Sequence, residues 1–252
     1  MINFCILGSF ELRSEQGVWV PRGPKVRRLL ALLLLRANQV VDIDTLAEEL
    51  WDGAPPRTVV ATIRTHVYHL RQMMAKESGR SELADRLTTE PTGYRMRVAD
   101  DQVDVRRFQR LVGDGRSALA HGRTVEAARH LREALGLWHG APLTNVPAGP
   151  VLARHVAHLE ETRIRAMELW VETDMRLGLH RELIPDLRGL VAANLLNEWF
   201  HARLIEALHL SGRRGEALLA FRDLRRVLHE ELGLEPSAEL QRLHHEILAT
   251  AG

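Results

Sequence analysis

The feature that most constrains the fold is a stretch from Arg57 to Met74 in which apolar residues recur at steps of three and four. This spacing places them on one side of an α-helix of about five turns, roughly 27 Å long. One face of the helix is therefore predicted to pack against a core, and the other is predicted to face outward. The apolar stripe consists of Val60, Ile63, Val67, Leu70 and Met74.

The opposite face of this predicted helix is polar and lacks acids. No aspartate or glutamate occurs from Arg57 to Lys76, although the whole chain has a formal net charge of only +1. Basic side chains bind phosphates and guanine edges, and threonine or glutamine can reach other base edges, so such a face suits a DNA major groove. An ordinary amphipathic helix with a solvated basic face is the alternative. The polar residues are Thr62, Arg64, Thr65, His66, Tyr68, His69, Arg71 and Gln72.

The elements predicted before the long helix follow the order of a helix-turn-helix. Alternating apolar residues over 4–12 predict one strand with a buried face. The leucine run within residues 25–37 predicts a central buried helix. Residues 42–51 predict a second helix, with Asp42 or Asp44 as its N-cap. Two helices, a short turn and a helix with a polar reading face complete the motif.

A β-hairpin is predicted directly after the long helix. Residues 76–85 form a polar linker, and residues 87–98 alternate apolar and polar side chains around turn-forming residues at 91–93. A hairpin in this position is a wing, which can reach an adjacent groove or the DNA backbone. We therefore predict a winged helix-turn-helix DNA-binding domain over residues 1–98.

The remainder, residues 104–252, is predicted to be helical and to contain a repeat. Glycines 122, 178 and 212 are each followed four residues later by glutamate and then by an apolar residue. The second and third copies start 34 residues apart, which is the tetratricopeptide period. Each copy predicts a helix, a turn and a second helix packing back, and such pairs must stack to bury their faces. Generic helical bundling is the alternative. The predicted fold class is mainly α with a small β component.

Charge and composition limit the classes of function. Residues 1–98 carry a formal charge of +3 and the rest of the chain −2, which suggests different partners for the two halves. The single cysteine, Cys5, excludes an intrachain disulfide and a cysteine-cluster zinc site. The longest apolar run, residues 29–35, is too short to span a bilayer, so a cytoplasmic protein with no membrane partner is expected.

Catalytic chemistry is not indicated anywhere in the sequence. There is no phosphate-binding loop of the P-loop type and no nucleophile elbow. The histidine pairs lack a third ligand at a suitable spacing, so no metal is expected. We therefore expect no cofactor and no enzymatic activity. The histidine pairs are His66 and His69, His155 and His158, and His244 and His245.

Taken in order, these motifs resemble the Streptomyces antibiotic regulatory proteins, which are pathway-specific activators of secondary metabolism in actinomycetes. The resemblance covers the full length: the first part is similar to the OmpR-type winged helix of response regulators, and the second to the bacterial transcriptional activation domain. The motifs are residues 23–35 (GPKVRRLLALLLL), 46–51 (LAEELW), 63–71 (IRTHVYHLR), 91–94 (PTGY), 104–108 (DVRRF) and 231–236 (ELGLEP).

The resemblance implies an activator of an antibiotic biosynthesis gene cluster. Such a protein binds direct repeats in double-stranded promoter DNA as tandem protomers and recruits the RNA polymerase holoenzyme through sigma factor and other subunits. Larger members add an ATPase domain, so ATP control within this chain is not expected. The expected DNA contacts are Lys25, Arg28, Arg57, Thr58, Thr62, Arg64, Thr65, His66, His69 and Arg71, and, in the wing, Thr88, Thr92 and Arg95.

One position departs from the family pattern. Many wings of this type carry arginine before the turn, whereas this chain has Glu90. An acid beside phosphate is unfavourable, so Arg95 or Arg97 is expected to take over that contact. The alternative function is an interaction scaffold, in which the repeat domain binds a partner protein and the winged helix does not bind DNA.

Overall fold

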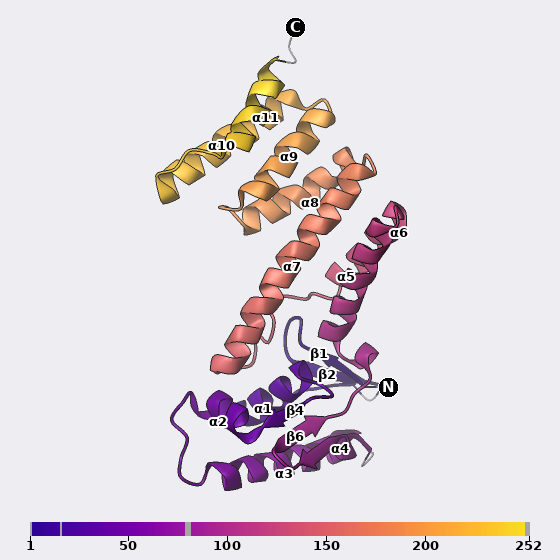
Figure 1. Cartoon of the computed structure of the whole chain (residues 1–252), viewed down its shortest axis with the longest axis vertical. Coiled ribbons are helices and arrows are strands. Elements are labelled where there is room, and N and C mark those ends of the chain that lie inside the picture. Colours follow the sequence, from indigo (N-terminus) through magenta and orange to yellow (C-terminus); the bar gives the residue numbers. More distant parts are fainter. Residues whose placement is uncertain (1, 16, 79–81, 250–252) are drawn as a thin grey trace. The chain divides into compact units, whose positions relative to one another are not determined.

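The structure of the chain is a computed structural model with two compact units, each with its own apolar core (Figure 1). The structure describes residues 2–15, 17–78 and 82–249, and the side chains of 77, 78 and 82 are not described. The first unit comprises Met1–Arg116 and His130–Ala166, and the second comprises Ser117–Arg129 and Met167–Gly252.

The first unit begins with an antiparallel sheet of three short strands. They are β1 (Asn3–Cys5), β2 (Glu11–Ser14) and β3 (Gly17–Trp19), in the order β1-β2-β3. The prediction of one continuous strand over residues 4–12 is therefore wrong, because the chain reverses and places Phe4 opposite Leu12. Both residues are nevertheless buried, as are Ile6 and Phe10. The alternating pattern continues through the turn, so it identifies the buried side chains without revealing the reversal.

The three predicted helices of the helix-turn-helix are present. They are α1 (Pro24–Leu35), α2 (Ile43–Trp51) and α3 (Val59–Ser78). Leucines 29, 30, 32, 33 and 34 of α1 are completely buried, which confirms the central helix. Asp42 caps α2, as predicted, because its Oδ1 accepts a hydrogen bond of 2.7 Å from the Thr45 amide.

Helix α3 packs on the core through the predicted stripe, with one exception. Ile63, Val67, Leu70 and Met74 are at most 1% exposed, whereas Val60 is 41% exposed. The first turn of α3 lies outside the core, where Val60 follows the exposed residues of the preceding loop. The assignment of Val60 to the buried stripe is therefore wrong, because helical spacing does not show where core cover begins.

The predicted wing is a hairpin that joins a second small sheet. Its strands are β4 (Val40–Asp42), β5 (Leu87–Glu90) and β6 (Gly93–Met96), in the order β4-β6-β5. Gly93 lies against β4 so closely that a Cβ there would be 1.9 Å from the Val41 carbonyl oxygen, so the position requires glycine. Within the predicted linker the structure has a short helix, α4 (Glu82–Asp85), and residues 79–81 lie outside the described part.

A short 3₁₀ helix, η1 (Asp100–Gln102), follows the wing, and three long helices follow it. They are α5 (Asp104–Ala120), α6 (Thr124–Leu135) and α7 (Pro150–Arg176). The first unit therefore contains the winged helix together with the start of α5, the end of α6 and the start of α7. The predicted DNA-binding domain, residues 1–98, accordingly shares one compact unit with residues from later in the chain.

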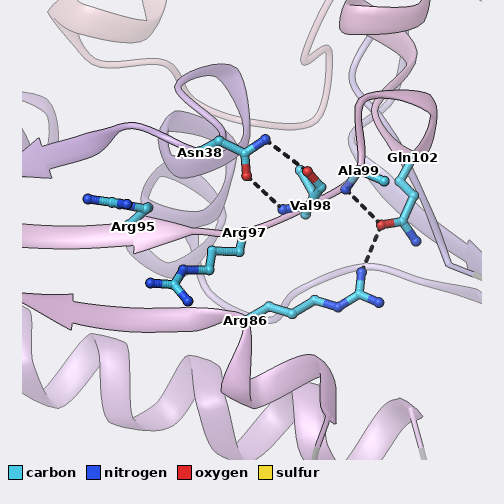
Figure 2. Close-up of a pocket in the computed structure, with 7 residues that line it drawn as sticks. All are labelled: Asn38, Arg86, Arg95, Arg97, Val98, Ala99 and Gln102. Carbon is cyan, nitrogen blue, oxygen red and sulfur yellow. Dashed lines mark hydrogen bonds between the residues drawn. The ribbon is translucent and has the colours of Figure 1, made fainter.

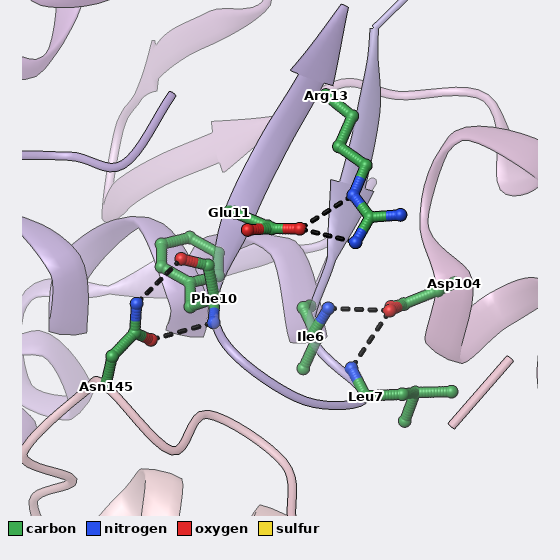
Figure 3. A network of polar contacts seen from close by, with 7 residues as sticks. All are labelled: Ile6, Leu7, Phe10, Glu11, Arg13, Asp104 and Asn145. Carbon is green, nitrogen blue, oxygen red and sulfur yellow. Dashed lines mark hydrogen bonds and ion pairs between the residues drawn. The ribbon is translucent and has the colours of Figure 1, made fainter. Parts of the chain in front are cut away.

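Asp104 and Asn145 hold later parts of the first unit against its β1-β2 sheet (Figure 3). Asp104 Oδ2 accepts the amides of Ile6 and Leu7 at 2.7 and 2.9 Å. Asn145 pairs with both backbone groups of Phe10, accepting its N–H at 2.7 Å and donating to its carbonyl at 3.1 Å. Burial raises the pKa of Asp104 to about 6, although backbone hydrogen bonds oppose this shift.

Glu49 of α2 caps the start of α7 across a sequence separation of 100 residues. Its side chain is fully buried, and its two oxygens accept the amides of Gly149 at 2.7 Å and Leu152 at 2.8 Å. Gly149 has no room for a side chain, because a Cβ would lie 2.3 Å from the Glu49 carbonyl oxygen. Burial raises the pKa of the Glu49 carboxyl, and its hydrogen bonds oppose that shift. We call the contacts made by Arg28, Glu49, Asp104 and Asn145 the junction.

The second unit is built from helix pairs. After the end of α7 come α8 (His180–Ala193), α9 (Glu198–Leu210), α10 (Arg214–Leu232) and α11 (Ala238–Ala249). Its apolar core includes Leu187, Phe221 and Leu224.

The predicted repeat is present as three equivalent turns. Gly122, Gly178 and Gly212 have φ values of 73°, 75° and 76°, a conformation that favours glycine. In each turn the glycine amide bonds the carbonyl three residues earlier, and the next amide bonds the carbonyl five residues before it. This shared geometry supports the predicted tetratricopeptide-like repeat. Together with the small sheets of the first unit, it confirms the predicted fold class, a winged helix-turn-helix followed by an all-helical domain.

Two kinds of feature are absent from the described residues, membrane-spanning helices and metal-binding clusters. None of the described helices combines the length and apolarity that crossing a membrane requires. The same residues hold no cluster of three or more histidine, cysteine, aspartate or glutamate side chains suited to a metal ion.

Candidate nucleic-acid interface

The exposed face of α3 forms a continuous polar strip opposite the buried stripe. Its residues recur at helical spacing and include no acid. Within the described part of the chain, no carboxylate contacts the guanidinium groups of Arg57 or Arg64, so both cations face solvent. We call this strip, together with Arg57 and Thr58 just before it, the reading face. On α3 its exposed residues are Ala61, Arg64, Thr65, Tyr68, His69 and Gln72.

The threonines of α3 have their hydroxyl protons engaged by the helix itself. Thr62 Oγ1 donates to the Thr58 carbonyl and Thr65 Oγ1 to the Ala61 carbonyl, each at 3.1 Å. The hydroxyl oxygen can still accept a hydrogen bond, and the methyl group is fixed in orientation. Thr65 is exposed and therefore presents an acceptor and a methyl group outward, whereas Thr62 is half-buried.

Lys25, Trp51 and His66 form a cluster that joins the three helices. Lys25 Nζ lies 4.1 Å from the centre of the Trp51 ring, a cation–π contact, and the Trp51 and His66 rings are 6.5 Å apart. Burial lowers the pKa of His66, with a smaller contribution from Lys25, and its Nε2 atom is buried. Both predicted contact residues are thus half-buried and packed on Trp51.

Arg71 ties α3 to the wing. Its Nε and Nη2 atoms donate to the Leu87 carbonyl at 3.0 and 2.6 Å, and Nη2 also donates to Thr89 Oγ1 at 3.0 Å. These contacts use most of one edge of the guanidinium group. Arg71 therefore fixes the position of strand β5 against the helix that carries the reading face.

Arg28 of α1 belongs to the junction. Its Nε donates to the Pro147 carbonyl, and Nη1 donates to the Glu49 carbonyl at 3.0 Å and to Asp52 Oδ1 at 3.1 Å. The side chain is only 16% exposed. The family resemblance grouped Arg28 with the other expected DNA contacts, and the structure places its guanidinium group among backbone carbonyls of the chain.

Thr92 lies at the exposed tip of the wing. Glu90 lies beside two partners, the hydroxyl group of Thr88 and the guanidinium group of Arg95. Thr88 Oγ1 donates to Glu90 Oε1 at 3.1 Å, and Arg95 Nε lies 3.3 Å from the same oxygen. The carboxylate that departs from the family pattern is thus balanced within the wing. Within the described residues the Arg97 side chain has no hydrogen-bond or ion-pair partner and is exposed.

Two exposed apolar residues on the outer side of α3 were not among the expected contacts. Tyr68 is 59% exposed, with its ring 5.7 Å from the ring of His69, and Val60 is 41% exposed. Tyr68 follows the helical spacing of Arg64 and Thr65, so its position on the polar face was visible in the sequence. The helical spacing alone was therefore enough to include Tyr68 among the expected contacts, whereas nothing in the sequence indicated that Val60 is exposed.

Comparisons with known proteins match both halves of the chain. A family model described as a bacterial transcriptional activator domain matches residues 103–248, and one described as transcriptional regulatory protein, C terminal, matches residues 17–96. Regulatory protein DnrI of Streptomyces peucetius is 40% identical over 231 residues, which cover 90% of this chain and 85% of DnrI. Regulatory protein AfsR of Streptomyces griseus is 34% identical over 98% of this chain, which spans 24% of AfsR.

A solved structure has the same fold over the whole chain. Mycobacterium tuberculosis EmbR, in a complex with a low affinity phosphopeptide, aligns with a TM-score of 0.87 at 30% sequence identity. The alignment covers 100% of this chain and 66% of the EmbR chain. The order of a winged helix and a helical repeat domain is therefore shared with a protein of known structure.

Proposed function

Because the chain belongs to the Streptomyces antibiotic regulatory protein family of transcriptional regulators, we propose that it activates transcription by binding specific sites in promoter DNA. The observation that carries this proposal is the reading face of α3. It is exposed and free of acids, and it carries cations that the described part of the chain leaves without carboxylate partners. A helix with these properties matches the charge and hydrogen-bonding groups of a major groove.

In this proposal the reading face divides into phosphate and base contacts. Arg57 and Arg64 bind phosphates, since both guanidinium groups face solvent. Thr65 and His69 contact base edges. The fixed hydroxyl of Thr65 accepts from the amino group of adenine or cytosine, and its methyl group suits the thymine methyl. Tyr68 adds apolar contact area next to His69.

The remaining expected residues support the reading face in different ways. Thr58 lies just before α3, and we propose that the wing residues Thr88, Thr92 and Arg95 contact the DNA backbone of the adjacent groove. Lys25, Thr62, His66 and Arg71 are half-buried, so we propose that they hold α3 and the wing in position and contribute any DNA contact from the edge of the interface. Arg28 is also half-buried, and we propose that it acts only at the junction, where its guanidinium group is engaged.

The wider role that we propose follows from the family. The regulated promoters are those of a secondary-metabolite gene cluster, and tandem protomers occupy direct repeats. The helical domain contacts the RNA polymerase holoenzyme. Direct repeats require a head-to-tail arrangement, in which the same face of each protomer contacts a different face of its neighbour.

Selection from a random pool of duplex DNA tests the proposal. We expect the purified chain to enrich a short motif repeated at about one helical turn, near 10–11 base pairs. A double variant, Thr65→Ala with His69→Ala, is expected to lose enrichment at particular positions of that motif. A pool that stays random, with binding that disappears at moderate salt, would leave only non-specific electrostatics and favour the scaffold function.

A further inference from the structure

A hollow of about 490 Å³ lies at the end of the wing sheet (Figure 2). Three arginines line it: Arg86 precedes β5, Arg95 lies in β6, and Arg97 follows β6. Tyr94 and Met96 alternate with Arg95 and Arg97 and are buried, so the two arginines lie on the opposite side of β6 from the core. The hollow therefore collects three cations on the outer side of the wing.

No carboxylate is among the residues that line this hollow in the described chain. Arg86 Nη1 donates to Gln102 Oε1 at 2.8 Å, which also accepts the Ala99 amide at 3.1 Å. Asn38 is held by the backbone of the strand end, donating to the Val98 carbonyl at 2.9 Å and accepting its amide at 3.0 Å. The amide side chains are thus fixed, and they form a polar wall beside the cations.

The positive charge in the hollow is incompletely balanced. Arg95 Nε is buried and lies 3.3 Å from Glu90 Oε1, but the approach does not meet hydrogen-bond geometry, so this nitrogen has no hydrogen-bond acceptor. The Arg97 guanidinium group has no hydrogen-bond or ion-pair partner among the described residues. Figure 2 shows Arg86 extending toward Gln102, while Arg95 and Arg97 extend in the other direction. The cations are therefore spread along the hollow and do not share one acceptor.

We propose that this hollow binds a phosphate-bearing small molecule. A guanidinium group matches a phosphate with two parallel hydrogen bonds, so Arg97, which has no carboxylate partner among the described residues, would hold the phosphate next to Arg95 in its pair with Glu90. The volume is much larger than a phosphate group needs and lies within the range of about 300–1,000 Å³ typical of small-molecule sites. The remainder of the ligand lies along Val98 and Ala99, where the amide groups of Asn38 and Gln102 provide polar contacts.

The same phosphate chemistry has two sources, a free phosphate ester and the backbone of bound DNA. The site differs in either case from the base-reading surface of α3, because its residues belong to the wing and to the segments at residues 38 and 99–102. The proposal therefore does not depend on sequence-specific reading by α3. It predicts affinity for a phosphate monoester in the absence of DNA.

Titration of the ¹⁵N-labelled full-length chain with adenosine 5′-monophosphate tests the proposal, with NMR detection of the arginine Nε–H signals. We expect saturable shifts of the Arg95 and Arg97 signals, and none with uncharged adenosine. Arg97→Gln is expected to weaken binding by about tenfold, because it removes a charged hydrogen-bond donor. Arg110→Gln, an exposed arginine on α5 without a partner in the described residues, is the matched control and should bind normally.

The titration repeated with duplex DNA already bound separates the two sources. Retention of the response assigns the site to a free phosphate ester and supports the proposal. Loss of the response assigns the site to a DNA phosphate and would overturn the proposal of a small-molecule ligand. Shifts that fail to saturate, or that are equal in the wild type and Arg97→Gln, would overturn the proposal. Because Arg97 is exposed, its substitution is not expected to disturb folding.

Discussion

The junction and the reading face are both rich in polar side chains. Those of the junction are bonded within the chain, whereas those of the reading face are exposed to solvent. At the junction, Glu49 is fully buried and Asp104 is half-buried, and both accept backbone amides from distant parts of the chain. On the reading face, Arg64 and His69 remain exposed. A polar group whose bonds are satisfied within the chain stabilises the fold, whereas one left toward solvent is available to a partner. The comparison thus separates residues that build the first unit from residues that we propose to bind DNA.

The largest expected effect is on the junction. Glu49→Ala leaves the amides of Gly149 and Leu152 buried without an acceptor, and each such group costs about 1–3 kcal/mol. We expect the free energy of unfolding to fall by about 3 kcal/mol or more. Urea denaturation followed by circular dichroism measures this loss.

The neighbouring residue Glu48 provides the matched control. It pairs with Arg154 at 3.0 Å, but both side chains are substantially exposed. Glu48→Ala is therefore expected to cost about 0.5 kcal/mol. Equal losses for the two alanine variants would contradict the special role of the buried carboxylate.

A second effect concerns the pH dependence of stability. The folded-state pKa of Asp104 is about 6, above its usual 3.8, so the folded chain holds this proton more tightly than the unfolded chain. The resulting stabilisation is fully present below about pH 4 and is lost as pH rises through about 6. Its full size corresponds to about 3 kcal/mol.

Unfolding free energies of the wild type and Asp104→Asn, measured from about pH 4 to about pH 7, test this dependence. Asparagine does not titrate, so the wild type should gain stability relative to the variant as the pH is lowered. Subtracting the free energy of unfolding of the variant from that of the wild type at each pH also removes the contributions that both proteins share, including that of Glu49. A difference that is constant with pH would exclude a raised pKa at Asp104.

Much of the fold could be predicted because local patterns coincide with burial. The leucine run of α1, the N-cap at Asp42 and the repeat glycines each have a local physical cause, and all are present. The junction could not be predicted in the same way. Glu49 reads as an ordinary acid of an amphipathic helix, and its partners lie 100 and 103 residues later. Such pairings depend on tertiary packing that periodicity does not encode.

The reading face offers a smaller effect that is confined to DNA binding. Thr65→Ala removes the fixed acceptor and methyl group, so we expect a loss of about 1–3 kcal/mol at one base pair of the binding site. Stability should be nearly unchanged because Thr65 is exposed. Competition between single-base variants of the selected duplex measures the effect. A uniform loss across all sequences would mean that Thr65 does not read a base.

The sequence only partly distinguishes the residues of the candidate interface from the residues that support the fold. Helical spacing correctly places Arg64, Thr65 and His69 on an exposed face. It does not distinguish Arg64 from Arg28, because both are arginines in basic helices. The structure distinguishes them by partners, since Arg28 donates to carbonyls of the junction. Whether a cation is available therefore depends on its three-dimensional surroundings, and the DNA contacts themselves stay a prediction.

The most direct test compares Arg64→Ala with Arg28→Ala in the salt dependence of DNA affinity, measured by fluorescence anisotropy. If Arg64 binds a phosphate, its loss should weaken binding to all sequences and reduce the salt slope by about one, without changing stability. Arg28→Ala should instead lower stability and leave the slope unchanged while the protein is folded. An unchanged slope for Arg64→Ala, or a reduced slope for Arg28→Ala alone, would contradict the division between reading face and junction.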